Sequence, residues 1–162
     1  MTREQQLRGW IKGLTWVFIV GLFLSGVTAI PLLPEVNWLA EHFNAADKSS
    51  VVAGWLARVR EALGQTQSQY PFLFYGTDWL AFGHFMIAIV FIGALRDPVR
   101  NRWLFDFGLI ACGLVIPYAF VFGGFRGIPI WWRLIDCSFG VFGFVPLWFC
   151  RKWTKEVEEL MS

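Results

Sequence analysis

A pair of charged residues, Arg133 and Asp136, lies inside the apolar stretch 127–150, which reads GIPIWWRLIDCSFGVFGFVPLWFC. As a helix rising about 1.5 Å per residue, this stretch is long enough to cross a bilayer, and its two charges lie one turn apart. Each charge costs roughly 2.5–3.5 kcal/mol inside a bilayer, so both residues need partners. The Arg133 guanidinium can hold a carboxylate, a phosphate or a quinone oxygen in a forked contact.

Three more polar residues of apolar segments, Asp78, His84 and Tyr118, are predicted at a similar height in the membrane. Counting about 1.5 Å per residue from the flanking basic residues puts His84 roughly 18 Å up, Asp136 about 22 Å and Tyr118 about 24 Å. The same count gives about 27 Å for both Arg133 and Asp78. In a hydrocarbon layer about 30 Å thick, all five lie in the outer half. The sequence therefore predicts a ligand pocket open to the outer side, where His84 and Asp136 can exchange protons.

The same five residues also have a purely structural interpretation. Arg133 and Asp136 can neutralise each other at i,i+3 spacing, and Asp78 can cap a helix. His84 can donate a hydrogen bond to a neighbouring carbonyl, and Tyr118 can belong to the aromatic belt at the membrane interface. Both interpretations stay open at this point.

Other chemistry finds little support in the sequence. No HExxH, P-loop, GxSxG or dinucleotide-binding pattern is present, so no catalytic residue and no cofactor is assigned. Cys112, Cys137 and Cys150 fall inside apolar runs without CxxC spacing, which predicts buried thiols and no metal site. Asp106 follows Arg102 by four residues, a spacing that predicts a surface ion pair on one helix.

Composition predicts the elements that must position these residues. The chain of 162 residues is 56% hydrophobic, 19% aromatic and only 16% charged, whereas soluble domains are about a quarter charged. Ten Trp and seventeen Phe are more than a small soluble core can bury, so the excess apolar surface must face lipid or other proteins. The net charge of +2 and the lack of a basic run interleaved with aromatics argue against nucleic acid as a partner.

The predicted fold is an all-α integral membrane protein, a single domain (1–162) formed by an antiparallel bundle of four transmembrane helices. The helices are expected at about 14–33, 78–95, 103–122 and 128–150, after a short amphipathic lead-in at 1–12. Within the polar connection 35–77, apolar residues recur every four positions, which predicts an amphipathic interfacial helix at about 49–63, ending at Gly64. Thr77 or Asp78 is expected to cap the second membrane helix.

Basic residues set the predicted orientation. They precede the first membrane helix, lie between the second and third, and follow the fourth, whereas the other two connections carry few near helix ends. By the positive-inside rule both termini are cytoplasmic, in a membrane of the bacterial inner-membrane type. The Gly140–Gly143 pair permits close helix approach, either within one chain or between chains.

In outline, four apolar helices with a decorated first connection are similar to several small bacterial membrane families, including the DoxX-like proteins. No motif is shared residue by residue, so the similarity implies neither an activity nor site residues.

Three functions are compatible with the sequence. The first is the binding, or the transport, of a small amphipathic ligand such as a lipid or quinone in the outer pocket. The second is a non-catalytic assembly subunit that packs against copies of itself or other membrane proteins. The third is a membrane enzyme that uses His84 and Asp136 for proton transfer.

Overall fold

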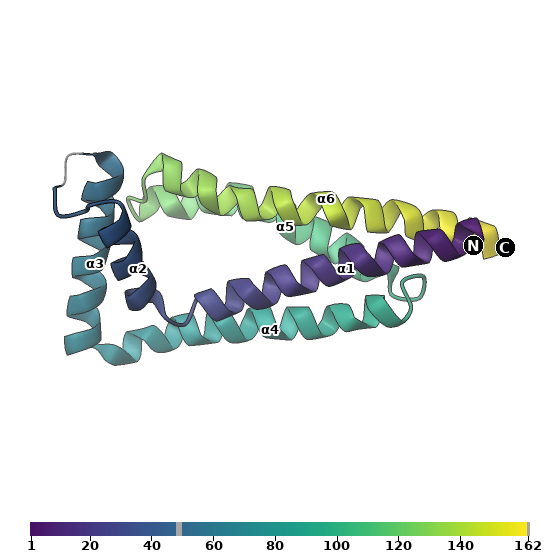
Figure 1. The fold of residues 1–162 in the computed structure, drawn as a ribbon, viewed down its shortest axis with the longest axis horizontal. Helices are drawn as coiled ribbons and strands as arrows, with labels where there is room; N and C mark the ends of the chain where they lie inside the picture. Colours follow the sequence, from purple (N-terminus) through teal and green to yellow (C-terminus); the bar gives the residue numbers. More distant parts are fainter. Residues whose placement is uncertain (48–49, 162) are drawn as a thin grey trace. The chain divides into compact units, whose positions relative to one another are not determined.

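The computed structural model describes residues 1–47 and 50–161, and every regular element in that part of the chain is a helix (Figure 1). Within it, four helical stretches are long and apolar enough to cross a membrane, which confirms the predicted all-α class with four candidate spans. The elements are α1 (Arg3–Thr28), α2 (Leu32–His42), α3 (Val51–Gln69), the 3-10 helix η1 (Pro71–Phe74), α4 (Tyr75–Arg96), α5 (Arg102–Phe125) and α6 (Ile130–Met161).

Helix α1 begins and ends at other residues than predicted. The expected lead-in at 1–12 and the first membrane helix form one continuous helix that begins at Arg3. Its start is a capping box, because the Gln5 amide donates to Thr2 Oγ1 (3.3 Å) and the Thr2 amide donates to Gln5 Oε1 (3.0 Å). The helix ends at Thr28 rather than at residue 33.

The residues beyond that end belong to α2, an element that the sequence analysis missed. Pro34 lies in the first turn of α2, where its missing N–H and fixed φ cause no loss of a helical hydrogen bond. The predicted polar connection therefore begins with a helix. Val36 and Ala40 of α2 are buried.

Helix α3 coincides with the predicted amphipathic helix, although predicted residue 49 lies outside the described residues. Ser50 is its N-cap, and the Ser50 hydroxyl accepts a hydrogen bond from the Ala53 amide (3.1 Å). The expected stop at Gly64 is wrong, because the helix continues to Gln69. One glycine costs a helix only about 1 kcal/mol, which the flanking helix formers offset.

Helices α4 and α6 are longer than predicted. Helix α4 begins at Tyr75, and Thr77, inside its first turn, donates to the Phe74 carbonyl (2.7 Å), so neither Thr77 nor Asp78 is the cap. Helix α6 continues beyond the predicted end at residue 150 to Met161 and has 32 residues. At 1.5 Å per residue this is about 48 Å, well beyond the roughly 30 Å of a hydrocarbon layer.

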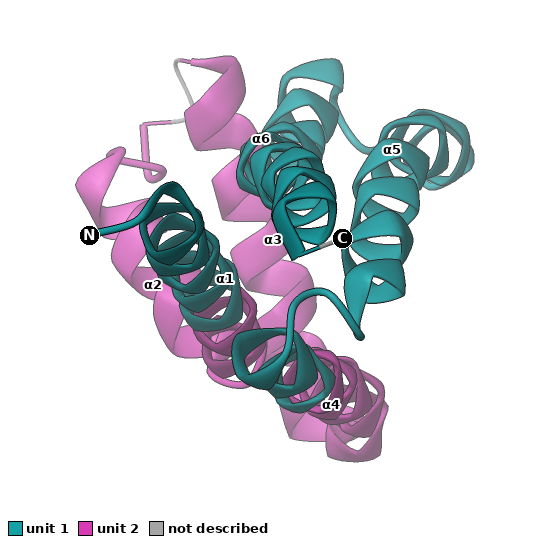
Figure 2. Ribbon diagram, turned by 90° about the vertical axis from the view of Figure 1, so that its right-hand side faces the viewer, with its two compact units in different colours: residues 1–21, 88–162 teal, residues 22–87 magenta. Residues whose placement is uncertain are grey.

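The chain divides into two compact units (Figure 2). The first contains residues 1–21 and 88–162, and the second contains residues 22–87. In each candidate span, 22% of the most apolar window is buried inside the protein. Most of the apolar side chains therefore face outward, as lipid-exposed surfaces require.

Within the first unit, small residues bring α5 and α6 into close contact. A Cβ atom on Gly140 would lie 2.6 Å from the Cys112 carbonyl oxygen, and one on Gly143 would lie 2.8 Å from Cys112 Sγ. Both glycines thus serve packing inside one chain. The turn between the helices uses Gly127 at a φ of 68°, a conformation that favours glycine.

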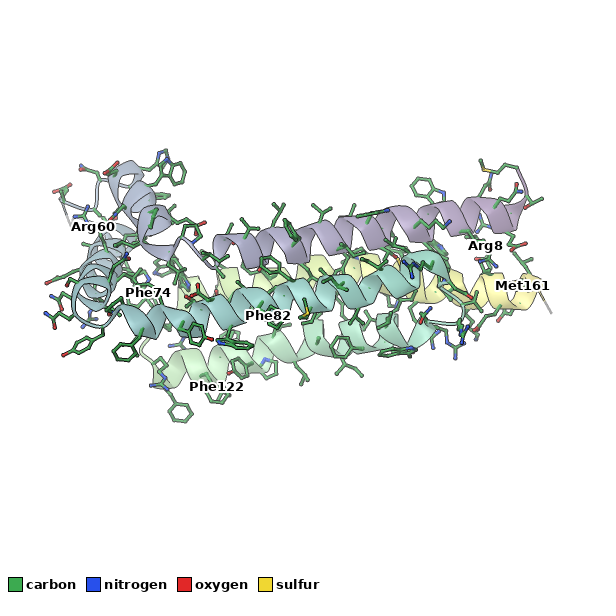
Figure 3. The ribbon with its side chains drawn as sticks, turned by 90° about the horizontal axis from the view of Figure 1, so that it is seen from below. Arg8, Arg60, Phe74, Phe82, Phe122 and Met161 are labelled. Atoms are coloured by element: carbon green, nitrogen blue, oxygen red, sulfur yellow. The ribbon has the colours of Figure 1, made fainter. Side chains whose placement is uncertain are left out.

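The first unit is fully buried in several places, and one of them is the contact between α1 and α6 near the two ends of the chain. Leu7, Ile11 and Thr15 of α1 and Cys150 and Val157 of α6 are at most 1% exposed. The Cys150 thiol lies 3.7 Å from the Ile11 carbonyl oxygen, and Arg8 Nη2 lies 2.9 Å from Met161 Sδ (Figure 3). All three cysteines are free and buried, in agreement with the prediction.

Ion pairs between helices surround this end of the first unit. Arg151 Nε lies 2.5 Å from Asp106 Oδ1, and Arg102 pairs with Glu158. The predicted pair of Arg102 with Asp106 on one helix is therefore wrong. Residues of α6, which is longer than expected, provide the partners of both side chains.

The second unit is held by two sets of contacts. Helices α2 and α3 pack together, and their buried residues include Ala53 and Leu56 of α3. The end of α1 approaches α4 at Gly26, where an added Cβ would lie 2.6 Å from Phe85 Cε1, and the Phe23 and Phe85 ring centroids are 5.2 Å apart.

Partial burial also raises the pKa of Glu35 on α2 above its ordinary value.

Candidate functional site

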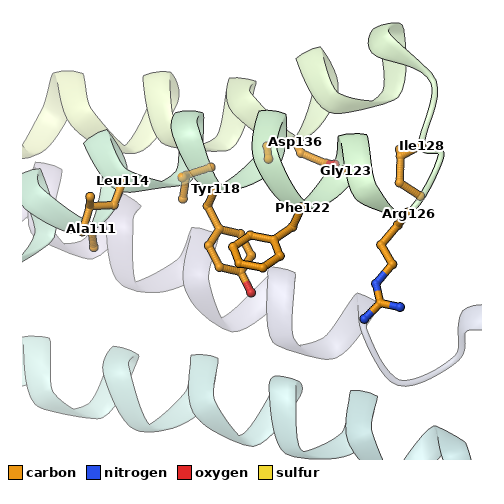
Figure 4. A pocket seen from close by; sticks show the side chains of 10 residues that line it. Ala111, Leu114, Tyr118, Phe122, Gly123, Arg126, Ile128 and Asp136 are labelled. Atoms are coloured by element: carbon orange, nitrogen blue, oxygen red, sulfur yellow. The ribbon is translucent and has the colours of Figure 1, made fainter.

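A cavity of the first unit runs along α5 and has a volume of about 520 Å³ (Figure 4). Figure 4 places Ala111 and Leu114 at one end, Arg126 at the other, and the rings of Tyr118 and Phe122 between them. The lining is mainly apolar, and its polar side chains are Tyr118, Arg126 and Asp136.

Helix α6 contributes Asp136 to this cavity. Gly140, one turn further on, packs against Cys112, and Arg133, one turn before, packs against Gly123. Asp136 therefore faces the middle turns of α5, the same side as Tyr118. Among the described residues it has no ion-pair or side-chain hydrogen-bond partner within the usual distances, so its carboxyl group is available to a ligand.

The predicted pairing of Arg133 with Asp136 is not formed. Arg133 Nε donates instead to the Ile128 carbonyl oxygen at 2.7 Å. Its side-chain carbons cover Gly123, where an added Cβ would lie 2.9 Å from Arg133 Cδ. Arg133 thus connects the start of α6 with the end of α5. It lies next to the cavity, because Gly123 is one of the residues that line the cavity.

Arg126 is the cation that lines the cavity, and the sequence analysis did not select it. It directly follows the last residue of α5, and its amide donates to the Phe122 carbonyl (3.0 Å). Its side chain is exposed and has no ion-pair partner in the part of the chain described. A sequence signal exists, because Arg126 is the one basic residue in the short turn 123–127 that joins two apolar segments.

Tyr118 forms the centre of the cavity together with Phe122. Their ring centroids are 4.4 Å apart with a 35° angle between the planes, so the two rings pack against each other in a tilted arrangement. The two residues are four positions apart on α5, which places them on one face of the helix. They present a flat aromatic surface with one phenolic hydroxyl.

His84 and Asp78 belong to the second unit and do not line this cavity. His84 Nδ1 is 2.8 Å from the Leu80 carbonyl oxygen on its own helix, as in the structural interpretation of this residue. Asp78 is exposed in the first turn of α4. Their predicted part in a shared site remains a prediction.

A second cavity, of about 280 Å³, lies within the second unit. Its lining contains no ionisable side chain, and Gln67 is its main polar group. The other lining residues are Ile30, Pro31, Leu32, Leu33, Pro34, Pro71 and Phe74. In residues 1–47 and 50–161, no three His, Cys, Asp or Glu side chains gather as a metal site would require.

Comparison of the chain with protein-family models, with curated proteins and with solved structures gives no match. Its function must therefore be inferred from the geometry of the α5–α6 cavity.

Proposed function

We propose that the protein is a multi-pass membrane protein that binds a small amphipathic molecule, a lipid or a quinone-like compound, in the cavity along α5. One observation carries this proposal: a single cavity combines an apolar end at Ala111 and Leu114 with a phenol, a guanidinium and a carboxyl group. The apolar part of the ligand lies along Ala111 and Leu114, and its polar part lies at Tyr118, Arg126 and Asp136.

The size and position of the cavity support this assignment. Ligand pockets in proteins usually measure about 300–1,000 Å³ and have mostly apolar linings with a few polar groups. Ionisable residues in membrane helices usually face a cavity or the interior of the bundle, as Asp136 does. The cavity extends over about 15 residues of α5, or roughly 22 Å, a length suited to a molecule with a hydrocarbon tail.

We further propose the predicted membrane arrangement for the whole chain. The four candidate spans form an antiparallel bundle, α3 lies at the outer membrane surface, and both termini are cytoplasmic in a bacterial inner membrane. Lys12, Arg96, Arg100 and Lys152 are exposed at the chain-end side of the first unit, which supports this orientation. In this arrangement Arg133, His84 and Asp78 belong to the same outer level as the cavity.

The test is to fill the cavity. Leu114→Trp adds bulk to the lining, whereas Ile110→Trp, one turn away and not in the lining, is a matched control because the two wild-type side chains are 60% and 62% exposed. Both variants are purified in mild detergent and incubated with phosphatidylethanolamine, phosphatidylglycerol and ubiquinone. Native mass spectrometry then measures bound molecules.

We expect Leu114→Trp to lose at least one of these adducts roughly tenfold relative to the wild type, and Ile110→Trp to retain it. Equal adducts in all three proteins would contradict the proposed function.

A further inference from the structure

The cavity contains two opposite charges that are not paired with each other. Asp136 and Arg126 both line it, and neither forms an ion pair with any residue that the structure describes. Asp136 lies within a candidate span, where an unpaired charge is costly, and Arg126 lies at the end of the neighbouring span. A ligand with complementary charges gives both groups a partner. A neutral ligand satisfies neither charge, and an anionic ligand satisfies only Arg126.

The spacing of the charges also limits the ligand. On α6, Asp136 lies between Arg133, which contacts Gly123, and Gly140, which contacts Cys112. Asp136 is therefore level with about Ala119 of α5, which also lines the cavity. From there to Arg126, just beyond the end of α5, is seven residues or about 10 Å. An extended arginine side chain together with a phospholipid headgroup covers this order of distance.

On the basis of the proposed function, we propose that the ligand is a zwitterionic lipid with a primary ammonium group, of which phosphatidylethanolamine is the type. Its ammonium group donates to the Asp136 carboxylate, and its phosphate accepts from Arg126. One acyl chain lies along Val115, Leu114 and Ala111. Charge-assisted hydrogen bonds at both ends of the headgroup then fix its direction in the cavity.

The Tyr118 hydroxyl fits the same headgroup. It lies on the lining between the apolar end of the cavity and Arg126 (Figure 4). A phenol can donate to a phosphate or ester oxygen at this level. Its ring, tilted against that of Phe122, lies beside the glycerol region of the lipid.

The experiment compares three lipids that share acyl chains: phosphatidylethanolamine, phosphatidylglycerol and phosphatidylcholine. The ammonium group of the first donates hydrogen bonds, the second has no cation, and the third has a quaternary cation without a donor. Native mass spectrometry titrations give their relative affinities for the wild type, Asp136→Asn and Arg126→Gln. Asp106→Asn, which removes a carboxylate outside the cavity, is the matched control.

For the wild type we expect phosphatidylethanolamine to bind roughly tenfold more tightly than either other lipid. Asp136→Asn should abolish that preference, Asp106→Asn should retain it, and Arg126→Gln should weaken all three lipids together. If Asp136→Asn does not fold, the wild-type preference alone decides.

Equal affinities in the wild type, or a preference that survives Asp136→Asn, would overturn the zwitterion assignment. The proposed function fails separately, when Leu114→Trp leaves every adduct unchanged. A third outcome is that Leu114→Trp loses its ubiquinone adduct while the wild type shows no preference among the lipids. The cavity would then still be a ligand site, but its ligand would not be a zwitterionic lipid.

Discussion

Asp106 and Asp136 lie in neighbouring candidate spans and have opposite surroundings. Asp106 accepts a hydrogen bond from Arg151 on the next helix, and this ion pair neutralises it. Asp136 faces a cavity, without an ion-pair partner among the described residues. The first carboxylate therefore serves the contact between α5 and α6, whereas the second is left without a charged partner beside the cavity.

The strength of the Asp106–Arg151 ion pair can be predicted. In a double-mutant cycle, Asp106→Asn and Arg151→Gln should show a coupling free energy of about 0.5–1 kcal/mol, because the two side chains are partly exposed. The same cycle with Asp106→Asn and Arg102→Gln is the control and should show almost none. Unfolding experiments in detergent measure the coupling free energy of each pair. A larger coupling for Asp106 with Arg102 would support the predicted i,i+4 ion pair instead.

Glu35 gives a pH-dependent prediction outside the spans. Burial raises its pKa in the folded protein above the unfolded value, so the folded state holds the proton more tightly. This tighter proton binding stabilises the folded protein at pH values below the pKa that Glu35 has in the unfolded chain. The stabilisation is lost as the pH rises through the pKa that Glu35 has in the folded protein. Because Gln has no carboxyl group to titrate, the Glu35→Gln variant does not lose stability in this way as the pH rises.

The variant should therefore gain thermal stability relative to the wild type as the pH rises from 4 to 7, as melting temperatures would show. Glu41→Gln on the same helix, a residue that is exposed, is the control. A wild-type protein that becomes more stable than Glu35→Gln over this range would contradict the assignment.

The sequence identified Tyr118 and Asp136, which line one cavity, but it selected Arg133 where Arg126 lines the cavity. Counting residues along a helix gives a height, and it contains no information on the direction in which a side chain points. Arg133 bends toward the Ile128 carbonyl, a contact that depends on the turn at Gly127.

At the scale of elements, the contact between α5 and α6 forms the cavity. Gly140 lies against the Cys112 backbone one turn beyond Asp136, and Arg133 covers Gly123 one turn before it. The separation of the two helices, and therefore the width of the cavity, depends on these contacts.

Gly140→Ala should disturb this contact. Its added Cβ would lie 2.6 Å from a backbone oxygen, so the helices must move apart at a cost of about 1–3 kcal/mol. Gly113→Ala on α5, where nothing lies within 4 Å, should be neutral or gain up to about 1 kcal/mol from helix propensity. Thermal unfolding of both variants checks this, and equal stabilities would place Gly140 outside the helix contact.

Four apolar segments were predictable because length and hydropathy alone determine them. Helix α2 was missed because Pro31 and Pro34 suggested the end of a helix, whereas Pro34 also suits the first turn of the next one. The continuation of α6 was missed because its last turns have a mixed sequence. Their helical form depends on tertiary contacts such as the buried Val157.

At the scale of the whole molecule, charge differs between the two units. In the described residues of the second unit, the acidic side chains are Glu35, Glu41, Asp47, Glu61 and Asp78, and the basic ones are Arg58 and Arg60. The first unit has an excess of Arg and Lys. Most of them lie towards the two chain ends (Arg3, Arg8, Lys12, Arg151, Lys152 and Lys155) or at the α4–α5 connection (Arg96, Arg100 and Arg102). Such asymmetry is what orients membrane proteins.

The proposed orientation predicts the accessibility of two tags. A short epitope inserted after Ala46, an exposed residue between α2 and α3, should bind antibody in intact spheroplasts. The same epitope at the C-terminus should bind only after the membrane is permeabilised. The opposite pattern would reverse the orientation.

The three native thiols have a practical consequence for anyone who studies this chain. Cys112, Cys137 and Cys150 are 9%, 7% and 0% exposed, and thiol reagents need an accessible sulfur atom. A single cysteine introduced at an exposed position such as Ser68 should therefore take up a spin label or dye selectively in the otherwise natural sequence. One introduced cysteine in each unit would then allow the distance between the two labels to be measured in lipid without first removing any native cysteine.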